Sequence, residues 1–277
     1  MSKLVQPVLK WVGGKRQLIP EIEKYFPDKK NISTYYEPFV GGGAVLFHFQ
    51  PRKAVINDVN EELINLYRVI KDDVESLIED LRNYENDEDL YYEIRALDRS
   101  PEFKNLTNVQ RASRIHFLNK TCYNGLYRVN SAGEFNTPFG KYKNPNIVND
   151  TVLRAVSNYF NKSKIKILNG DYEEALKGIR KGAFVYFDPP YDPLSSSSNF
   201  TGYSEGGFDR EEQIRLKEVC DKLNSRGIKF LLSNSSTKFI KDLYKDYDII
   251  PVNAKRSINS VGSERGEVEE VLVKNYD

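Results

Sequence analysis

Short runs rich in apolar and β-branched residues alternate along this chain with longer stretches of helical periodicity. The expected strands cover residues 35–39, 53–57, 164–168, 183–187, 228–233, 248–252 and 268–273. Residues 61–81 and 211–223 carry apolar side chains at spacings of three and four, which is the period of an amphipathic helix. This alternation predicts an α/β protein with an open sheet covered by helices.

One connection in this pattern is far too long for a simple crossover. The second and third expected strands are separated by residues 58–163, whereas most connections in α/β units take only a few residues or a single helix. The intervening stretch has helical periodicity at first and becomes rich in Asn, Gly and Pro over residues 123–143. We therefore predict a mainly helical second domain (61–144) inserted into a discontinuous first domain (1–60 and 145–277).

The formal net charge of +1 hides two segments of opposite charge. Residues 58–102 hold 15 acidic and five basic side chains, whereas residues 104–143 hold seven basic and one acidic. The aromatic residues of the basic segment are Phe117, Tyr123, Tyr127, Phe135, Phe139 and Tyr142. Cations can meet phosphates and rings can stack on bases, so this mixture suits a nucleic-acid surface. On composition alone, a solvated face with a few core aromatics explains it equally well.

Composition excludes several classes of protein. With 39% hydrophobic and 29% charged residues the chain is not expected to be disordered, and the absence of an 18-residue apolar run predicts no membrane span. The first residues lack the apolar stretch of a signal peptide. Only two cysteines, Cys122 and Cys220, and two histidines predict neither a disulfide framework nor a bound metal. We expect a soluble intracellular protein.

A glycine-rich turn follows the first expected strand. Residues 37–44 run from an acidic residue through three glycines into a helix, which lets a ligand approach backbone N–H groups closely. The spacing disfavours a nicotinamide dehydrogenase, because Leu46 stands where the dinucleotide fingerprint has its third glycine or alanine. Asp58 ends the second strand, where an acid can accept both hydroxyls of a ribose. The alternative for Asp58 is to cap the helix that follows.

The sharpest signal is Asp188-Pro189-Pro190-Tyr191, which directly follows an apolar run. This position is the carboxyl end of an expected inner strand, where open α/β sheets bind their ligands. Two prolines lock the backbone and hold the neighbouring carbonyls rigidly. Asp188 and the Pro189 carbonyl thus become fixed acceptors for the two hydrogens of an exocyclic amine, and Tyr191 offers a ring to a flat base. An ordinary turn explains Asp-Pro alone but not all four residues.

Together these motifs resemble the Dam-type (α-class) DNA adenine-N6 methyltransferases, over essentially the whole chain. The resemblance implies a Rossmann-like, S-adenosylmethionine-dependent methyltransferase sheet with an inserted, mainly helical target-recognition domain. The residues that it implies for cofactor binding are Trp11, Lys15, Glu37, Phe39, Gly41, Gly43, Asp58, Asp171, Tyr172 and Asp188. The implied catalytic residues are Asp188, Pro189, Pro190 and Tyr191. Residues 233–236 resemble a further family motif near the base pocket.

Residues 123–128 and 133–140 resemble the target-recognition hairpin of family members that read GATC. The residues implied to contact DNA are Lys10, Tyr123, Asn124, Leu126, Arg128, Pro138 and Lys141. In this resemblance Arg128 takes guanine O6 and N7 bidentately, Tyr123 stacks or intercalates, and Asn124 contacts the strand left orphaned by flipping. Leu126 and Pro138 touch a thymine methyl. A lone tryptophan is more often a core residue than a ligand contact, but Trp11 lies in an N-terminal motif (residues 10–15) that resembles the cofactor motif of the family, and this favours a cofactor contact.

The implied activity is methyl transfer from S-adenosylmethionine to N6 of adenine in double-stranded DNA, within GATC and after base flipping. The alternatives are the same fold acting on cytosine N4, an RNA adenine or a protein glutamine amide, and a non-catalytic GATC-binding regulator. Asp188 favours adenine, the hairpin favours DNA, and a regulator has no use for the tetrapeptide. The implied setting is the cytoplasm of a bacterial or phage-infected cell, with no membrane partner and, where the system has one, a cognate restriction endonuclease.

Overall fold

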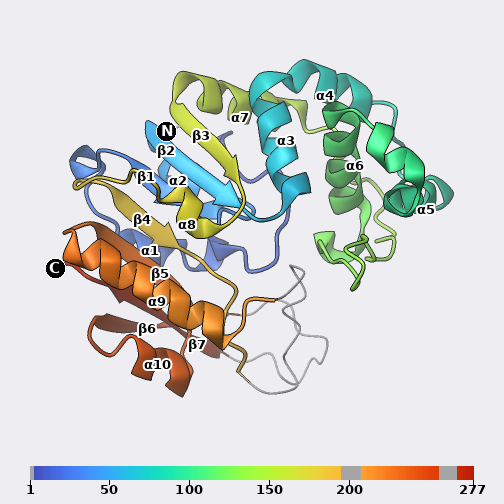
Figure 1. The fold of residues 1–277 in the computed structure, drawn as a ribbon. Helices are drawn as coiled ribbons and strands as arrows, with labels where there is room; N and C mark the ends of the chain where they lie inside the picture. The colour runs from blue at the N-terminus through green and yellow to red at the C-terminus, as the bar shows by residue number, and fades with distance from the viewer. Residues whose placement is uncertain (1–2, 195–206, 256–266) are drawn as a thin grey trace.

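The computed structural model describes residues 3–194, 207–255 and 267–277 of the chain. One seven-stranded sheet organises the fold, in the order β3-β2-β1-β4-β5-β7-β6 (Figure 1). The strands are β1 (Tyr35–Glu37), β2 (Lys53–Asp58), β3 (Lys164–Asn169), β4 (Phe184–Phe187), β5 (Lys229–Ser235), β6 (Asp248–Lys255) and β7 (Glu267–Lys274). All seven predicted strands are confirmed. The sequence also predicts loops at the serine run 195–198 and at the polar segment 256–266, and both lie outside the described residues.

The order in which the chain adds strands to the sheet reverses between β1 and β4. Strands β1 to β5 are parallel, and β7 runs antiparallel to both β5 and β6. From β1 the chain proceeds outward through β2 to β3, and it then returns to form β4 on the other side of β1. Such a reversal leaves a crevice at the carboxyl ends of the two central strands, which is where open α/β sheets bind ligands. The glycine-rich turn and the tetrapeptide follow β1 and β4 respectively, so both reach this point.

Helices cover the sheet and fill the long connection between β2 and β3 (Figure 1). They are α1 (Ile19–Tyr25), α2 (Ala44–Phe49), α3 (Glu61–Asp72), α4 (Val74–Leu81), α5 (Glu88–Ala96), α6 (Asn108–Thr121), α7 (Asp150–Lys162), α8 (Tyr172–Ala175), α9 (Arg210–Ser225) and α10 (Lys238–Leu243). None of the helices in the described ranges has both the length and the apolar composition that a membrane span requires.

The prediction of one helix over residues 61–81 is wrong. The backbone of Asp73 (φ −150°, ψ 54°) lies outside the helical region, and its N–H bonds to the Val69 carbonyl as α3 ends. Asp73 is both the C-cap of α3 and the N-cap of α4. An acidic side chain is unfavourable at a helix C-terminus and favourable at an N-terminus, so Asp73 suits the end of one helix less than the start of the next. Apolar residues on both sides of the break, such as Ile70 and Leu77, are fully buried. The apolar residues therefore keep their helical spacing across the break, and periodicity alone does not show that the helix ends at Asp73.

The core consists of two hydrophobic clusters, one on each face of the sheet. Because successive strand residues point to opposite faces, Phe184 belongs to the first cluster and Val185 to the second. The first cluster continues without interruption into the helices of the long connection, where it includes Leu63 and Phe117. The helices of residues 61–144 therefore share a core with the sheet.

Candidate active site

The loops after β1, β2 and β3 are tied together by one buried side chain. The Asn57 amide donates to the Pro38 carbonyl (3.1 Å) and to the Gly170 carbonyl (2.8 Å). The Asn57 carbonyl in turn accepts a hydrogen bond from the Val40 N–H (2.8 Å). The segments that carry the predicted cofactor residues at positions 37–43, 58 and 171–172 are thus held beside one another at the carboxyl edge of the sheet.

The N-terminal motif packs directly on the glycine turn (residues 40–43). Gly41 has a φ of 46° and Gly43 a φ of 70°, and Gly43 is the N-cap of α2. A Cβ on Gly41 would lie 2.9 Å from Trp11 Cδ1, and one on Gly42 would lie 2.9 Å from Trp11 Cβ. Glycine is required here both for its backbone conformation and for the indole that lies against it. The half-buried Trp11 also stacks on Tyr127, with 4.8 Å between ring centroids.

The Asp58 carboxylate joins β2 to the glycine turn. Its Oδ2 accepts from the Gly41 N–H (2.9 Å), and its Oδ1 accepts from the Asn60 N–H (3.0 Å). The alternative of Asp58 as the helix cap is wrong, because Asn60 caps α3 by accepting from the Leu63 N–H. Burial raises the pKa of Asp58, and the backbone N–H groups oppose that rise. Each carboxylate oxygen keeps a second lone pair that can accept a hydroxyl.

Aromatic and charged groups gather beyond β3. The rings of Phe39 and Tyr172 lie 5.0 Å apart between centroids. The guanidinium of Arg215 makes two hydrogen bonds to the Asp171 carboxylate (2.8 and 2.9 Å) and lies 4.8 Å from the centroid of the Tyr172 ring. Sequence analysis missed Arg215, because α9 is distant in sequence and no motif marks it. Within the described part of the chain the buried Tyr172 hydroxyl has no hydrogen-bond partner.

The tetrapeptide (residues 188–191) meets the N-terminal motif through Lys15. Lys15 Nζ lies 2.7 Å from Asp188 Oδ1 and 4.4 Å from the centroid of the Tyr191 ring, and the lysine is only 7% exposed. The Ser233 hydroxyl donates to the same Asp188 oxygen (2.9 Å). Burial raises the pKa of Asp188, and the Lys15 charge acts against that rise.

Two further acids lie at this edge of the sheet. Glu37, at the end of β1, is buried and accepts a hydrogen bond from the Tyr35 hydroxyl (2.8 Å). Burial raises the pKa of Glu37, and the nearby Asp188 carboxylate adds to the rise. The Tyr191 hydroxyl donates to Glu270 on β7 (2.9 Å), a contact that sequence analysis missed. Pro189 is buried and Pro190 half-buried, so the segment that carries the predicted catalytic residues is packed against the rest of the protein.

The predicted target-recognition segment forms a hairpin (residues 122–140) after α6. Antiparallel bridges pair Cys122 with Phe139 and Val129 with Phe135. The predicted DNA contacts that are exposed on or beside it are Lys10, Tyr123, Asn124, Arg128, Pro138 and Lys141, and Leu126 is half-buried. Tyr123 is 57% exposed, so its ring is accessible to a binding partner.

The N-terminal motif also contacts this hairpin. Asn119, in the last turns of α6, accepts from the Lys10 N–H (3.0 Å) and donates to the Lys10 carbonyl (2.8 Å). The same amide donates to the Gly125 carbonyl (3.0 Å). A Cβ on Gly125 would lie 2.6 Å from Lys10 Cδ, so the lysine stem packs on the hairpin. Lys10 thus joins the other predicted DNA contacts although residues 11–121 lie between Lys10 and the hairpin in the sequence.

Arg128 is exposed but already oriented. Its Nε donates to Asn136 Oδ1 (2.6 Å), and its Nη2 donates to the Asn136 carbonyl (3.2 Å). The two strands of the hairpin are joined here by the Asn136 N–H, which donates to the Arg128 carbonyl. An arginine held in this way loses less side-chain entropy when it binds a partner.

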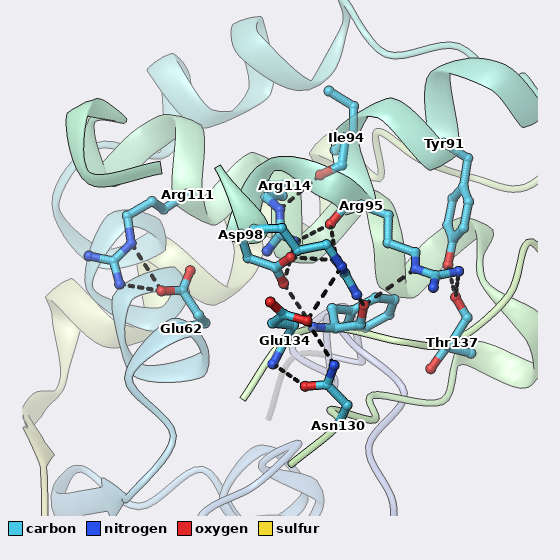
Figure 2. Close-up of polar contacts among 12 residues, drawn as sticks. Glu62, Tyr91, Ile94, Arg95, Asp98, Arg111, Arg114, Asn130, Glu134 and Thr137 are labelled. Carbon is cyan, nitrogen blue, oxygen red and sulfur yellow. Dashed lines mark hydrogen bonds and ion pairs between the residues drawn. The ribbon is translucent and has the colours of Figure 1, made fainter. Parts of the chain in front are cut away.

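A cluster of charged residues fixes the hairpin to α5 and α6 (Figure 2). Asp98 Oδ2 accepts from the Phe135 N–H (2.8 Å) and pairs with the buried Arg114 (2.7 Å). Arg99 donates to the Phe135 carbonyl (2.8 Å), and the Tyr91 hydroxyl donates to the Thr137 carbonyl (2.8 Å). Sequence analysis assigned no role to these side chains. They come from the acidic and the basic segments alike, so the two segments form one unit.

Residues 11–258 match the model of the family described as D12 class N6 adenine-specific DNA methyltransferase. The chain belongs to this family. The predicted resemblance to adenine-N6 methyltransferases is therefore confirmed, and a nicotinamide dehydrogenase and a non-catalytic regulator are set aside. The protein is an adenine-specific DNA methyltransferase.

Curated relatives of this D12 methyltransferase cover nearly its full length. The Type II methyltransferase M1.LlaDCHI of Lactococcus lactis subsp. cremoris is 47% identical over 274 residues, which are 98% of this chain and 96% of the relative. The Type II methyltransferase M.MjaIII of Methanocaldococcus jannaschii is 43% identical over 98% of this chain and 99% of its own. The DNA adenine methylase of Haemophilus influenzae is 35% identical over 96% and 92% respectively.

The family assignment agrees with the chemistry of the edge described above. A methyltransferase needs a site for a methyl donor and a site for the acceptor amine, and the glycine turn and the tetrapeptide follow the adjacent strands β1 and β4 at the same edge of the sheet. Among the described residues, no group of three or more His, Cys, Asp or Glu side chains is arranged to hold a metal ion.

Proposed function

We propose that this methyltransferase transfers the methyl group of S-adenosylmethionine to N6 of adenine within GATC, after flipping the target base out of duplex DNA. The observation that carries the proposal is the contact of Lys15 with Asp188 and Tyr191 at the switch point of the sheet. This contact supports the proposal, because the residues proposed to accept the amine hydrogens lie against the motif that also packs on the glycine turn. The hairpin that presents Arg128 supports the choice of GATC.

The residues around the glycine turn fit S-adenosylmethionine. The free lone pairs of Asp58 suit the two ribose hydroxyls, and the Phe39 and Tyr172 rings suit the adenine ring. Lys15 suits the carboxylate of the methionine part. The Tyr172 hydroxyl has no partner among the described residues and can form a hydrogen bond with the cofactor. When bound, S-adenosylmethionine supplies a methyl group activated on a sulfonium.

The tetrapeptide residues prepare the acceptor amine. The adenine amine is a poor nucleophile, because its lone pair is delocalised into the ring. Asp188 and the Pro189 carbonyl each accept one N–H, which draws the amine toward a tetrahedral geometry and frees its lone pair for in-line attack on the methyl group. The C–S bond of the donor would break as the N–C bond forms, with the electron pair left on sulfur, and the methylated amine would then lose one proton to solvent. Tyr191 stacks on the flipped base. The rate enhancement therefore comes from positioning and from fixed electrostatics. The charge of Lys15 helps to keep Asp188 ionised, as an acceptor of the amine hydrogen must be.

The segment 61–144 is the proposed DNA-reading unit, joined to the discontinuous catalytic unit (1–60 and 145–277). Arg128 reads guanine, and the exposed Tyr123 fills the space that the flipped base leaves. Lys10 contacts the outer guanine from the N-terminal motif. Lys141 and Lys143 are exposed cations that suit phosphates, which position the protein without reading sequence.

The specificity is tested by expressing the chain in a host without DNA methylation and sequencing its adenine and cytosine modifications. We expect N6-methyladenine at GATC and at no other sequence. Modification of adenine in a different site would refute GATC but leave the enzyme class intact. Cytosine N4 methylation would refute the assignment of the amine.

We expect Asp58→Ala to raise the dissociation constant for S-adenosylmethionine about tenfold or more. The loss of even one of the two ribose hydroxyl bonds to a charged acceptor, at roughly 1.5 kcal/mol, corresponds to about tenfold, which sets this floor. Isothermal calorimetry measures the change. The matched control is Asp87→Ala, because Asp87 caps α5 through the Leu90 N–H and touches no predicted cofactor residue. Equal and small effects of the two substitutions would assign Asp58 to loop structure instead.

A further inference from the structure

Two buried amide side chains bind the backbone on either side of Tyr191. Gln213, in the first turn of α9, donates from Nε2 to the Pro190 carbonyl (2.8 Å). Asn234, on β5, donates from Nδ2 to Gln213 Oε1 (3.1 Å) and accepts from the Asp192 N–H at Oδ1 (3.1 Å). The three bonds form a bridge from the peptide that precedes Tyr191 to the peptide that follows it.

The backbone determines the orientation of both amides. The Pro190 carbonyl can only accept a hydrogen bond, so the Gln213 NH₂ group must face it. The Asp192 N–H can only donate, so the Asn234 oxygen must face that group. The remaining oxygen and NH₂ group then pair with each other. Gln213 is 1% exposed and Asn234 fully buried, so no water competes for these positions.

This geometry acts on one residue of the tetrapeptide. The Pro190 carbonyl and the Asp192 N–H belong to the two peptide planes that meet at Tyr191, so holding both restricts its φ and ψ. Asp192 is restrained further, because its carbonyl accepts from the Ser235 hydroxyl (2.6 Å). The Tyr191 ring is held at its far end by Glu270. A ring with a fixed backbone and a fixed hydroxyl presents one face in one orientation.

We propose that Gln213 and Asn234 are positioning residues for methyl transfer, which act by holding Tyr191 in the orientation that receives the flipped adenine. The proposal rests on the stacking role of Tyr191 in the proposed function. Neither residue touches the reacting atoms. Their effect is on the alignment of the amine with Asp188 and the Pro189 carbonyl, and displacements of about 1 Å in such sites can cost about a hundredfold in rate.

The test variant is Gln213→Glu, which keeps the shape of the side chain. An ionised Glu at this position accepts from Asn234 but cannot donate to the Pro190 carbonyl. Burial raises the pKa of a carboxyl, so the variant is measured over a pH series that extends to about pH 10. At the alkaline end, where this carboxyl is ionised, we expect kcat on a GATC duplex to fall about tenfold or more, while the dissociation constant for S-adenosylmethionine changes less than twofold. Because a protonated carboxyl can donate to the carbonyl, the ratio of variant to wild-type kcat should rise as the pH falls.

The matched control uses an amide bridge at the opposite end of α9 and β5. Asn275 donates to Asn224 Oδ1 (3.0 Å) and accepts from the Phe230 N–H (2.8 Å), far along these elements from the tetrapeptide. Asn275→Ala should lower the melting temperature at least as much as Gln213→Glu and leave kcat unchanged. A loss of kcat in Gln213→Glu that does not vary with pH, or one that Asn275→Ala shares, would overturn the positioning role.

Base flipping by the wild type is measured separately with 2-aminopurine at the target adenine. A rise in its fluorescence on binding supports the role of Tyr191, and no rise would refute the proposed function itself. If the wild type flips the base and Gln213→Glu keeps wild-type kcat at every pH, the proposed function stands and this inference is wrong.

Discussion

Asp188→Ala is expected to reduce methylation of a GATC duplex by about 10²–10³-fold or more, which is the loss typical of removing one preorganised group at a reacting atom. One of the two acceptors that hold the amine disappears, and Lys15 is left buried without its partner. The measurement is single-turnover methylation with S-adenosylmethionine at saturation. Cofactor affinity is determined on the same variant, because Asp188 lies at the end of the site expected to hold the methionine part.

The control for this prediction is Ser233→Ala, which removes one hydrogen bond to Asp188 but keeps its carboxylate. Its loss of rate should be much smaller. Since burial raises the pKa of Asp188, wild-type activity should fall on acidification at a pH above that at which an ordinary aspartate protonates. If Asp188→Ala keeps a tenth of the wild-type turnover, the mechanism proposed for the tetrapeptide is wrong.

Arg128→Ala is expected to lower the ratio of kcat/KM on a GATC duplex to kcat/KM on a one-base variant by roughly five- to a hundredfold. The reason is that a bidentate arginine–guanine contact is worth about 1–3 kcal/mol against the wrong base. Asn136 orients the guanidinium before DNA arrives, which favours a specific contact over a loose one. The measurement is kcat/KM on the matched and mismatched duplexes at two salt concentrations.

Lys141→Ala and Lys143→Ala provide the contrast. Both lysines are exposed cations near Arg128 in the sequence, but as phosphate contacts they should weaken both duplexes equally. They should also flatten the dependence on salt, because fewer counterions are released on binding. If Arg128→Ala slows the matched and mismatched duplexes by the same factor, Arg128 is a phosphate contact. The hairpin would then not be the guanine reader, although the enzyme class would be unaffected.

Local patterns in the sequence were enough to predict the framework of this enzyme. The seven strands follow from short apolar runs, and the glycine turn and the tetrapeptide follow from residues that are neighbours in the chain. Gly41 and Gly43 have positive φ as a tight turn requires, and Asp188 stands at the end of an inner strand. The helix break at Asp73 escaped prediction, because apolar spacing continues across it and the cost of the break is met by tertiary packing.

The sequence by itself determined the strands, the glycine turn, the tetrapeptide and the family, because each of these depends on residues close together in the chain. Only the tertiary structure decided which side chains support them. Arg215 reaches Asp171, Asp98 holds the hairpin, and Gln213 binds the Pro190 carbonyl. A single donor or acceptor of this kind has no periodicity and no motif. Its partner is set by how the helices pack on the sheet, and that packing depends on the whole core at once.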